Sequence, residues 1–218
     1  MSTAKSATTH QHHHAHHFRS DLHEFVSAKE GIWIFMVTEV LMFGGLFVAF
    51  FIYQALKPAV FAEGASYLDW KLGALNTLVL IVSSWTMALS IHYIQKGQNQ
   101  RATWALITTL ACGLIFMIVK YFEYTHKFEM GLMPGKFFFF EKAVNAELPL
   151  YFGFYYSMTG LHGLHVLTGM GLISWVLWRH LNGEFNEHYY TAVEGVCIFW
   201  HIVDLVWIFL FPLLYLIE

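Results

Sequence analysis

The sequence predicts an all-α membrane protein, a bundle of five transmembrane helices, and three observations support this prediction. Hydrophobic residues make up 57% of the 218 residues and charged residues only 12%, about half of what soluble proteins carry. The apolar residues gather in five runs, each long enough for the roughly 20 residues with which a helix crosses a bilayer. Phe, Trp and Tyr reach 18%, as is typical where aromatic side chains mark the membrane interfaces.

The remaining totals exclude several classes of protein. A net charge of -3 is too small to indicate a nucleic-acid partner. Cys112 and Cys197 both fall inside apolar runs, which favours small core residues over a disulfide framework. No nucleotide-binding loop, nucleophile elbow or zincin motif occurs in the chain.

Residues 1–28 form a polar tail that we expect to be disordered, while residues 29–218 form the membrane domain. The tail is rich in histidine, notably His12, His13, His14, His16 and His17. Such a tract binds divalent metals weakly and nonspecifically. A solvated arm without a metal, or an engineered tag, is the alternative interpretation.

The predicted spans cover about residues 31–56, 72–95, 102–124, 148–178 and 192–217. The first span ends before Lys57-Pro58, because proline continues a helix poorly. It carries Gly44 and Gly45, which allow close approach of a neighbouring helix. A loop around Pro58 and Gly64 leads to the second span.

The second span carries serine, threonine and asparagine side chains, which can hydrogen-bond to neighbouring helices. A short basic connection from Lys96 to Arg101 leads to the third span, which continues through Glu123. The long loop that follows contains the apolar run Phe137–Phe140. We expect this run to enter the membrane interface or to pack on a partner.

The fourth span contains His162 and His165 in an uncharged run. Three residues apart, they share one face of a helix, and this spacing can supply two metal ligands or two interhelical hydrogen bonds. Gly160 and Gly163 predict tight helix packing on the neighbouring face.

The fifth span carries His201 and Asp204, which are also three residues apart. Asp204 can accept a hydrogen bond from the His201 ring or from a neighbouring helix. A membrane di-iron or haem site needs further ligands or an open axial pocket, and the remaining acids and histidines are too few and too scattered.

We therefore expect no catalytic centre, metal or cofactor in this chain. The residues interpreted as polar packing groups within the membrane are Glu123, His162, His165, His201 and Asp204. An independent membrane metalloenzyme that uses His162, His165 and Glu123 is the alternative.

Glu39 is the acidic residue within the first span. An ionised carboxylate in hydrocarbon is unfavourable, so we expect this group to be protonated, hydrogen-bonded or beside water. It is the candidate for proton handling or for contact with a lipid headgroup. A structural hydrogen bond to another helix is the alternative.

Four stretches resemble, in this order, subunit III of the haem-copper terminal oxidases. They are Thr38-Glu39-Val40 within residues 35–51, Tyr121-Phe122-Glu123-Tyr124, Leu161–Val166 and Phe199–Trp207. The resemblance covers the chain from about residue 31 to the C-terminus. It implies an all-helical accessory subunit without a redox centre, which packs beside subunit I and subunit II. Subunit I carries the haems and copper, and subunit II receives electrons.

The resemblance also implies that the chain stabilises subunit I and supports proton uptake coupled to oxygen reduction, partly through bound phospholipid. The longest members have seven helices, and those that this chain lacks help to enclose a lipid cleft. Five-helix forms are typical of bacterial oxidases, which act in the cell membrane. Thr38-Glu39-Val40 is similar to the cytochrome c branch, because quinol-oxidase members tend to have aspartate at position 39. The equivalent subunit of a quinol oxidase or nitric oxide reductase is the alternative.

The distribution of basic residues predicts the orientation. The connection with Lys96 and Arg101 holds no acidic residue. Positively charged short loops tend to remain in the cytoplasm. We expect the N-terminus to be cytoplasmic and, after five spans, the C-terminus to lie outside.

Overall fold

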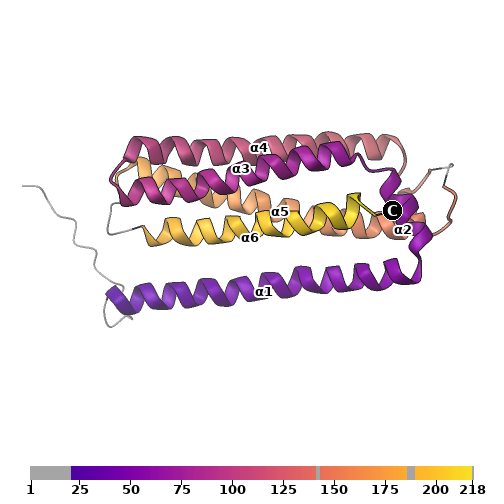
Figure 1. The fold of residues 1–218 in the computed structure, drawn as a ribbon, viewed down its shortest axis with the longest axis horizontal. Coiled ribbons are helices and arrows are strands. Elements are labelled where there is room, and N and C mark those ends of the chain that lie inside the picture. The colour runs from indigo at the N-terminus through magenta and orange to yellow at the C-terminus, as the bar shows by residue number, and fades with distance from the viewer. Residues whose placement is uncertain (1–20, 141–142, 186–189, 218) are drawn as a thin grey trace, which may run out of the picture.

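The computed structural model describes residues 21–140, 143–185 and 190–217, and this part of the chain is almost entirely helical (Figure 1). The elements are α1 (Asp21–Leu56), α2 (Pro58–Ser66), α3 (Trp70–Gln95), α4 (Asn99–Glu129), the short 3-10 helix η1 (Gly135–Phe137), α5 (Leu148–Leu181) and α6 (Thr191–Tyr215). Five helices are long and apolar enough to cross a membrane, namely α1 from Glu30 onward and α3 to α6. The predicted fold class is therefore confirmed.

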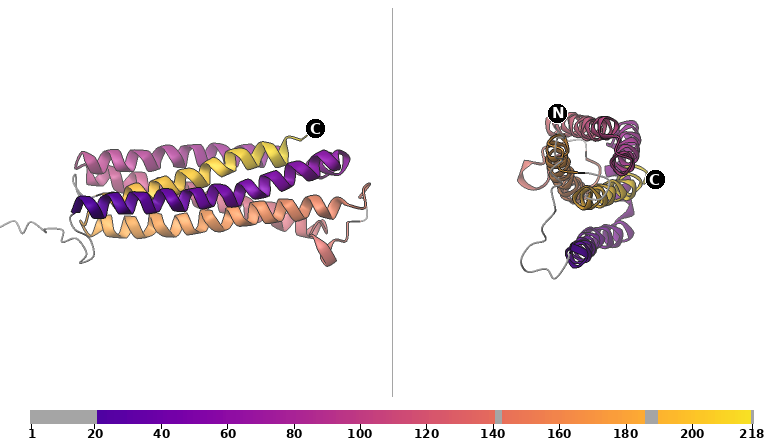
Figure 2. Two further views of the ribbon diagram at one scale, coloured as in Figure 1. Left: turned by 90° about the horizontal axis from the view of Figure 1, so that it is seen from below. Right: turned by 90° about the vertical axis from the view of Figure 1, so that its left-hand side faces the viewer.

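The long helices alternate in direction, so that the start of α1 and the α3–α4 connection share one end, while α2 and the C-terminus share the other (Figure 1). Seen along the helices, α3, α4, α5 and α6 surround a common centre, and α1 lies outside beside α6 (Figure 2). Helix α1 is also the least covered span, since 11% of its most apolar window is buried against 44% for α6. The fold is therefore a four-helix group with a peripheral fifth span.

Two helix boundaries differ from the prediction. The described part of α1 starts at Asp21, so residues 21–28 of the expected 1–28 tail are helical. Where the sequence predicts a loop after Pro58, the structure has helix α2, with Pro58 in its first turn. The N–H that proline lacks would have no partner in a first turn, so its absence costs nothing. The tail histidines from His12 to His17 lie outside the described residues.

Aromatic side chains fill the centre of the bundle, and small residues admit them at particular places. Trp200 and Trp207 of α6 are fully buried. A Cβ atom added at Gly169 of α5 would lie 2.7 Å from Cε3 of Trp200. This glycine therefore lets α5 and α6 approach closely.

The helices of this chain do not pack tightly against Gly44, Gly45, Gly160 or Gly163 within the described residues. A Cβ atom added at any of the four would have nothing within 4 Å. These glycines lie on outward faces of α1 and α5 rather than at a contact between helices of this chain. Composition alone does not reveal the rotation of a membrane helix, because its lipid-facing side is apolar as well.

The Phe137–Phe140 run divides into two pairs. Phe138 and Phe140 pack against the core, with the Phe140 ring 5.1 Å from that of Tyr67. Phe137 and Phe139 are 63% and 73% exposed. Insertion of this outward pair into a membrane interface or a partner remains a prediction.

Candidate functional site

The first polar site joins the peripheral helix α1 to the bundle. The carboxylate Oε2 of Glu39 lies 2.8 Å from Nε2 of His165 on α5, and the two side chains are 13% and 15% exposed. The rings of Phe43 and Phe199 lie 5.3 Å and 6.3 Å from the His165 ring. The pair is therefore held in apolar surroundings at the junction of α1, α5 and α6.

The contact of Nδ1, the other ring nitrogen of His165, determines which nitrogen carries a hydrogen when the ring is neutral. Nδ1 lies 2.8 Å from the carbonyl oxygen of Leu161, one turn earlier in α5. A carbonyl oxygen can only accept, so Nδ1 carries a hydrogen and donates it. Nε2 is thus the nitrogen that faces Glu39.

His162 points in a different direction from His165. Its ring is 1% exposed and lies between the rings of Phe116 and Trp207, with centroids 5.5 Å and 5.3 Å away. Neither ring nitrogen has a hydrogen-bond partner within the described part of the chain. His162 therefore packs within the bundle, whereas His165 binds α1, and the two do not converge on one point.

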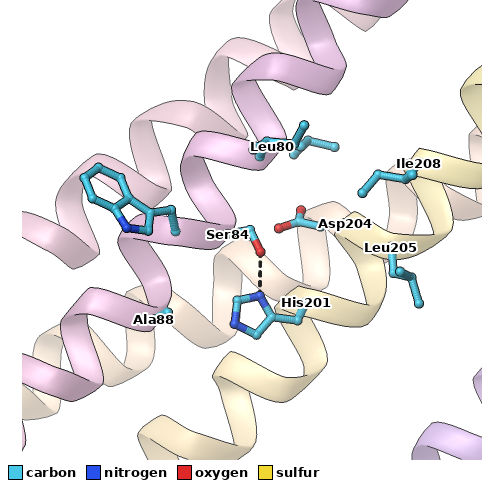
Figure 3. A pocket seen from close by; sticks show the side chains of 9 residues that line it. Leu80, Ser84, Ala88, His201, Asp204, Leu205 and Ile208 are labelled. Carbon is cyan, nitrogen blue, oxygen red and sulfur yellow. Dashed lines mark hydrogen bonds between the residues drawn. The ribbon is translucent and has the colours of Figure 1, made fainter.

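Asp204 and His201 of α6 face α3 (Figure 3). Nδ1 of His201 lies 2.6 Å from Oγ of Ser84, and Nε2 lies 3.2 Å from Sγ of Cys197. Both ring nitrogens of His201 therefore face partners other than Asp204, so the first of the two alternatives for Asp204 does not occur among these contacts. Asp204 is 2% exposed, and neither carboxylate oxygen has a well-formed hydrogen bond within the described residues.

Glu123 is the centre of a buried ionic cluster between α4, α5 and α6. Its carboxylate accepts from Lys120 at 2.9 Å, from Tyr155 at 3.0 Å and from Tyr215 at 2.5 Å. Nζ of Lys127 lies 3.4 Å away. The two lysines were not predicted from the sequence. Their spacing of three and four residues from Glu123, which places all three on one helix face, was the signal that could have revealed them.

The three residues of the metalloenzyme alternative are not brought together. The Glu123 carboxylate is engaged by lysines and tyrosines, His162 lies between aromatic rings, and His165 meets Glu39. Within residues 21–140, 143–185 and 190–217, no group of three His, Cys, Asp or Glu side chains is placed to hold a metal ion.

Comparison with known proteins assigns the family. Residues 5–218 match the family model described as cytochrome c oxidase subunit III. The chain is 36% identical to cytochrome c oxidase subunit 3 of Synechocystis, with 94% of this chain and 79% of the relative covered. It is 34% identical to the subunit of that name from Thermostichus vulcanus, with 86% of each covered. It is 28% identical to the probable quinol oxidase subunit 3 of Staphylococcus haemolyticus, with 91% and 92% covered. The chain therefore belongs to the cytochrome c oxidase subunit III family.

Proposed function

We propose that this chain is the accessory, non-redox subunit III of a bacterial cytochrome c oxidase that pumps protons during aerobic respiration. It packs beside subunits I and II, which hold the haems and copper, and it carries no catalytic centre or cofactor of its own. Family membership and the names of the relatives support the subunit III role. To this role we add two functions, which are the stabilisation of subunit I and the support of proton uptake.

The observation that carries this proposal is the contact between Glu39 and His165. Glu39 is the tenth residue of its span, about 14 Å from the span's start at the rise of an α-helix. A carboxyl and an imidazole at 2.8 Å can hold one proton in either of two arrangements. Polar groups at this depth are costly, and they commonly mark proton paths. The pair therefore suits transient storage of a proton beside subunit I.

The outward face of α1 supports a role in contacts with lipid or partner subunits. Trp33, Val37 and Leu41 are exposed large apolar side chains on the same helix as Glu39. We propose that the acyl chains of bound phospholipid lie on this face. We also propose that the chain lies in the bacterial cell membrane.

The orientation rests on the loops at the two ends. The basic connection with Lys96 and Arg101 lies at the same end as the start of α1 (Figure 1). Positive short loops favour the cytoplasm. We therefore place the N-terminus in the cytoplasm and the C-terminus outside.

Cytochrome c is the electron donor that we favour. Two cytochrome c oxidase relatives share 36% and 34% of aligned residues with this chain, against 28% for the quinol oxidase relative. The second candidate function is the equivalent subunit of a quinol oxidase, which that third relative motivates. A nitric oxide reductase subunit is a further alternative.

Purification of the complex from native membranes through this chain tests the proposal. We expect a haem-copper subunit to co-purify and oxygen to be consumed with reduced cytochrome c but not with quinol. Turnover with quinol or with nitric oxide, and none with cytochrome c, would support the alternatives instead. A preparation without any haem-copper subunit would contradict the proposed function altogether.

A further inference from the structure

A pocket on the side of the bundle, between α3 and α6, is not used by the proposed function (Figure 3). Its volume is about 470 Å³, which lies within the range of small-molecule sites. Trp85, Leu205 and Ile208 form part of its lining and are 65%, 49% and 44% exposed. The pocket therefore opens sideways through an apolar rim, within the membrane-spanning part of both helices.

The floor of the pocket holds the carboxyl of Asp204, which lacks a well-formed hydrogen bond within the described residues. Figure 3 shows this group pointing toward Ser84 across the space between α3 and α6. The hydroxyls of Ser84 and Ser83 lie beside this carboxyl and interact with it. Their well-formed contacts are with other groups, because Ser84 Oγ lies 2.6 Å from His201 Nδ1 and Ser83 Oγ donates to the Leu80 carbonyl. A buried carboxyl without a well-formed hydrogen bond is costly. It can therefore accept a better hydrogen-bond donor from outside this chain.

The depth of the pocket restricts what can supply that donor. Asp204 is the fourteenth residue of the 25 in α6, so it lies roughly 15–20 Å from either end of the helix. The charged headgroup of a phospholipid would have to leave the interface to reach this depth, which is strongly unfavourable. A membrane-soluble molecule with an uncharged head can reach it.

We propose that this pocket binds a neutral amphiphile whose head carries a hydroxyl group. The hydroxyl donates to the Asp204 carboxyl, and the apolar tail leaves the pocket between Leu205 and Ile208. Two kinds of molecule share this chemistry, a lipid-soluble hydroquinone and the free hydroxyl of a diacylglycerol. The exposed indole of Trp85 at the rim favours a ring that can stack on it. Binding alone is proposed, without electron transfer.

The test uses the protein extracted with its native partners and placed in lipid nanodiscs. Two radiolabelled probes are compared, decyl hydroquinone kept reduced and its dimethyl ether, which has similar bulk but no hydroxyl. Dioctanoylglycerol and its acetylated derivative form the second pair. Empty nanodiscs correct for partition into the lipid. Each probe is measured with the unaltered protein, with Asp204→Leu, with Leu205→Trp and with Ser174→Ala.

The variants separate binding from folding. Asp204→Leu removes the acceptor and replaces a buried carboxyl that lacks a well-formed hydrogen bond by an apolar group, a change that we expect the fold to tolerate. Leu205→Trp enlarges an exposed rim residue and blocks the entrance without altering the core. Ser174→Ala changes a hydroxyl on α5, where Ser174 donates to the Met170 carbonyl, and serves as the remote control.

We expect the unaltered protein and Ser174→Ala to bind one hydroxyl probe at least about tenfold more tightly than its capped analogue, since a buried acceptor discriminates against a ligand without the donor. Asp204→Leu should abolish this preference, and Leu205→Trp should abolish binding. The probe pair that shows the preference identifies the source. Equal binding of hydroxyl and capped probes would overturn the proposal. Crosslinking from position 205 to a transmembrane helix of a partner subunit would also overturn it and would make the pocket an interface.

Discussion

Nε2 of His165 lies 2.8 Å from Oε2 of Glu39, and this contact joins the least buried span of the chain to the four-helix group. The hydrogen bond from Nδ1 of His165 to the Leu161 carbonyl holds the ring in one tautomer when it is neutral. A proton that arrives at the pair can therefore reside on the carboxyl or on Nε2. We propose that the same contact serves both packing and proton storage, and substitutions separate these two roles.

Glu39→Gln is expected to leave the complex assembled while slowing proton uptake severalfold or shortening the working life of the enzyme. The amide has the shape of the carboxyl and can donate a hydrogen bond to His165, but it cannot take up a proton at this depth. Proton uptake by the complex in vesicles, followed with a pH indicator, and the number of turnovers before inactivation measure the effect.

Glu30→Gln is the matched control, because Glu30 begins the same span and is exposed. It should leave both measurements unchanged. Loss of the assembled complex in Glu39→Gln would show that Glu39 is a structural residue, which contradicts the proton-storage role.

Gly169→Ala is expected to destabilise the bundle by about 1–3 kcal/mol, the usual cost of an extra carbon in a packed core. The new Cβ would lie 2.7 Å from Cε3 and 2.9 Å from Cζ3 of Trp200, a ring that is itself fully buried. Unfolding in mixed micelles by increasing SDS, followed by tryptophan fluorescence, measures the change in the free energy of unfolding.

Gly163→Ala on the same helix provides the comparison, since nothing lies within 4 Å of the added carbon. That substitution should be neutral or stabilising by up to about 1 kcal/mol, because alanine favours the helix over glycine. Equal destabilisation by both substitutions would show that Gly163 is also a packing position, against the geometry of α5.

The spans were predictable because the bilayer imposes a simple rule. A chain inside hydrocarbon must satisfy its own backbone hydrogen bonds, so five long apolar runs become five helices. The predicted span at 102–124 nevertheless falls short of α4, which continues to Glu129. Lys127 ended the apolar pattern, yet its side chain is buried against Glu123. Hydropathy cannot detect a charge that is neutralised within the bundle.

The candidate site was predictable in part. Glu39 was identified because it is acidic within an apolar run, and this can be seen without knowing which residue it contacts. Its pairing with His165 depends on how α1 lies against α5, two helices distant in sequence. The spacing of His162 and His165 suggested a common direction, but two positions three apart differ by about 60° around a helix. This difference directs one ring into the core and the other toward α1.

Replacement of Glu123 by Leu should be more damaging than replacement of Lys120 by Met. Without Glu123, Lys120 and Lys127 would face each other as buried like charges, at a cost of about 3–5 kcal/mol for a broken buried pair. Without Lys120, the contact between Lys127 and Glu123 survives, although the cation–π contact of Lys120 with Trp207 at 4.5 Å is lost. The SDS unfolding experiment ranks the two variants.

Glu129→Gln, at the exposed end of the same helix, should have little effect on that scale. If Lys120→Met proved as destabilising as Glu123→Leu, the cluster would depend on Lys120 rather than on the central carboxylate.

Glu63 of α2 should make the loop after η1 sensitive to acid. Its carboxylate accepts from the backbone N–H groups of Val144 and Asn145 at 2.8 Å and 3.0 Å, and from the Asn145 amide at 2.6 Å. Burial alone would raise the pKa of Glu63, but these hydrogen bonds outweigh it and hold the pKa below the usual 4.5. A carboxyl whose pKa is lowered by folding stabilises the fold at pH values above its pKa in the unfolded chain. This contribution is lost as the pH falls through its pKa in the folded chain.

We therefore expect the segment from Ala143 to Glu147 to remain protected near neutral pH and to open as the pH falls below 4.5 and through the lowered pKa of Glu63. Cleavage of this loop by pepsin between pH 6 and pH 3, scaled to cleavage of an unfolded reference peptide, follows the opening. Glu63→Gln keeps one acceptor oxygen but cannot ionise, so its loop should be more open at pH 6 and should change little with acid. Glu129→Gln should retain the profile of the unaltered chain. A profile for Glu63→Gln that matches the unaltered chain would mean that the ionised Glu63 carboxylate does not hold the loop.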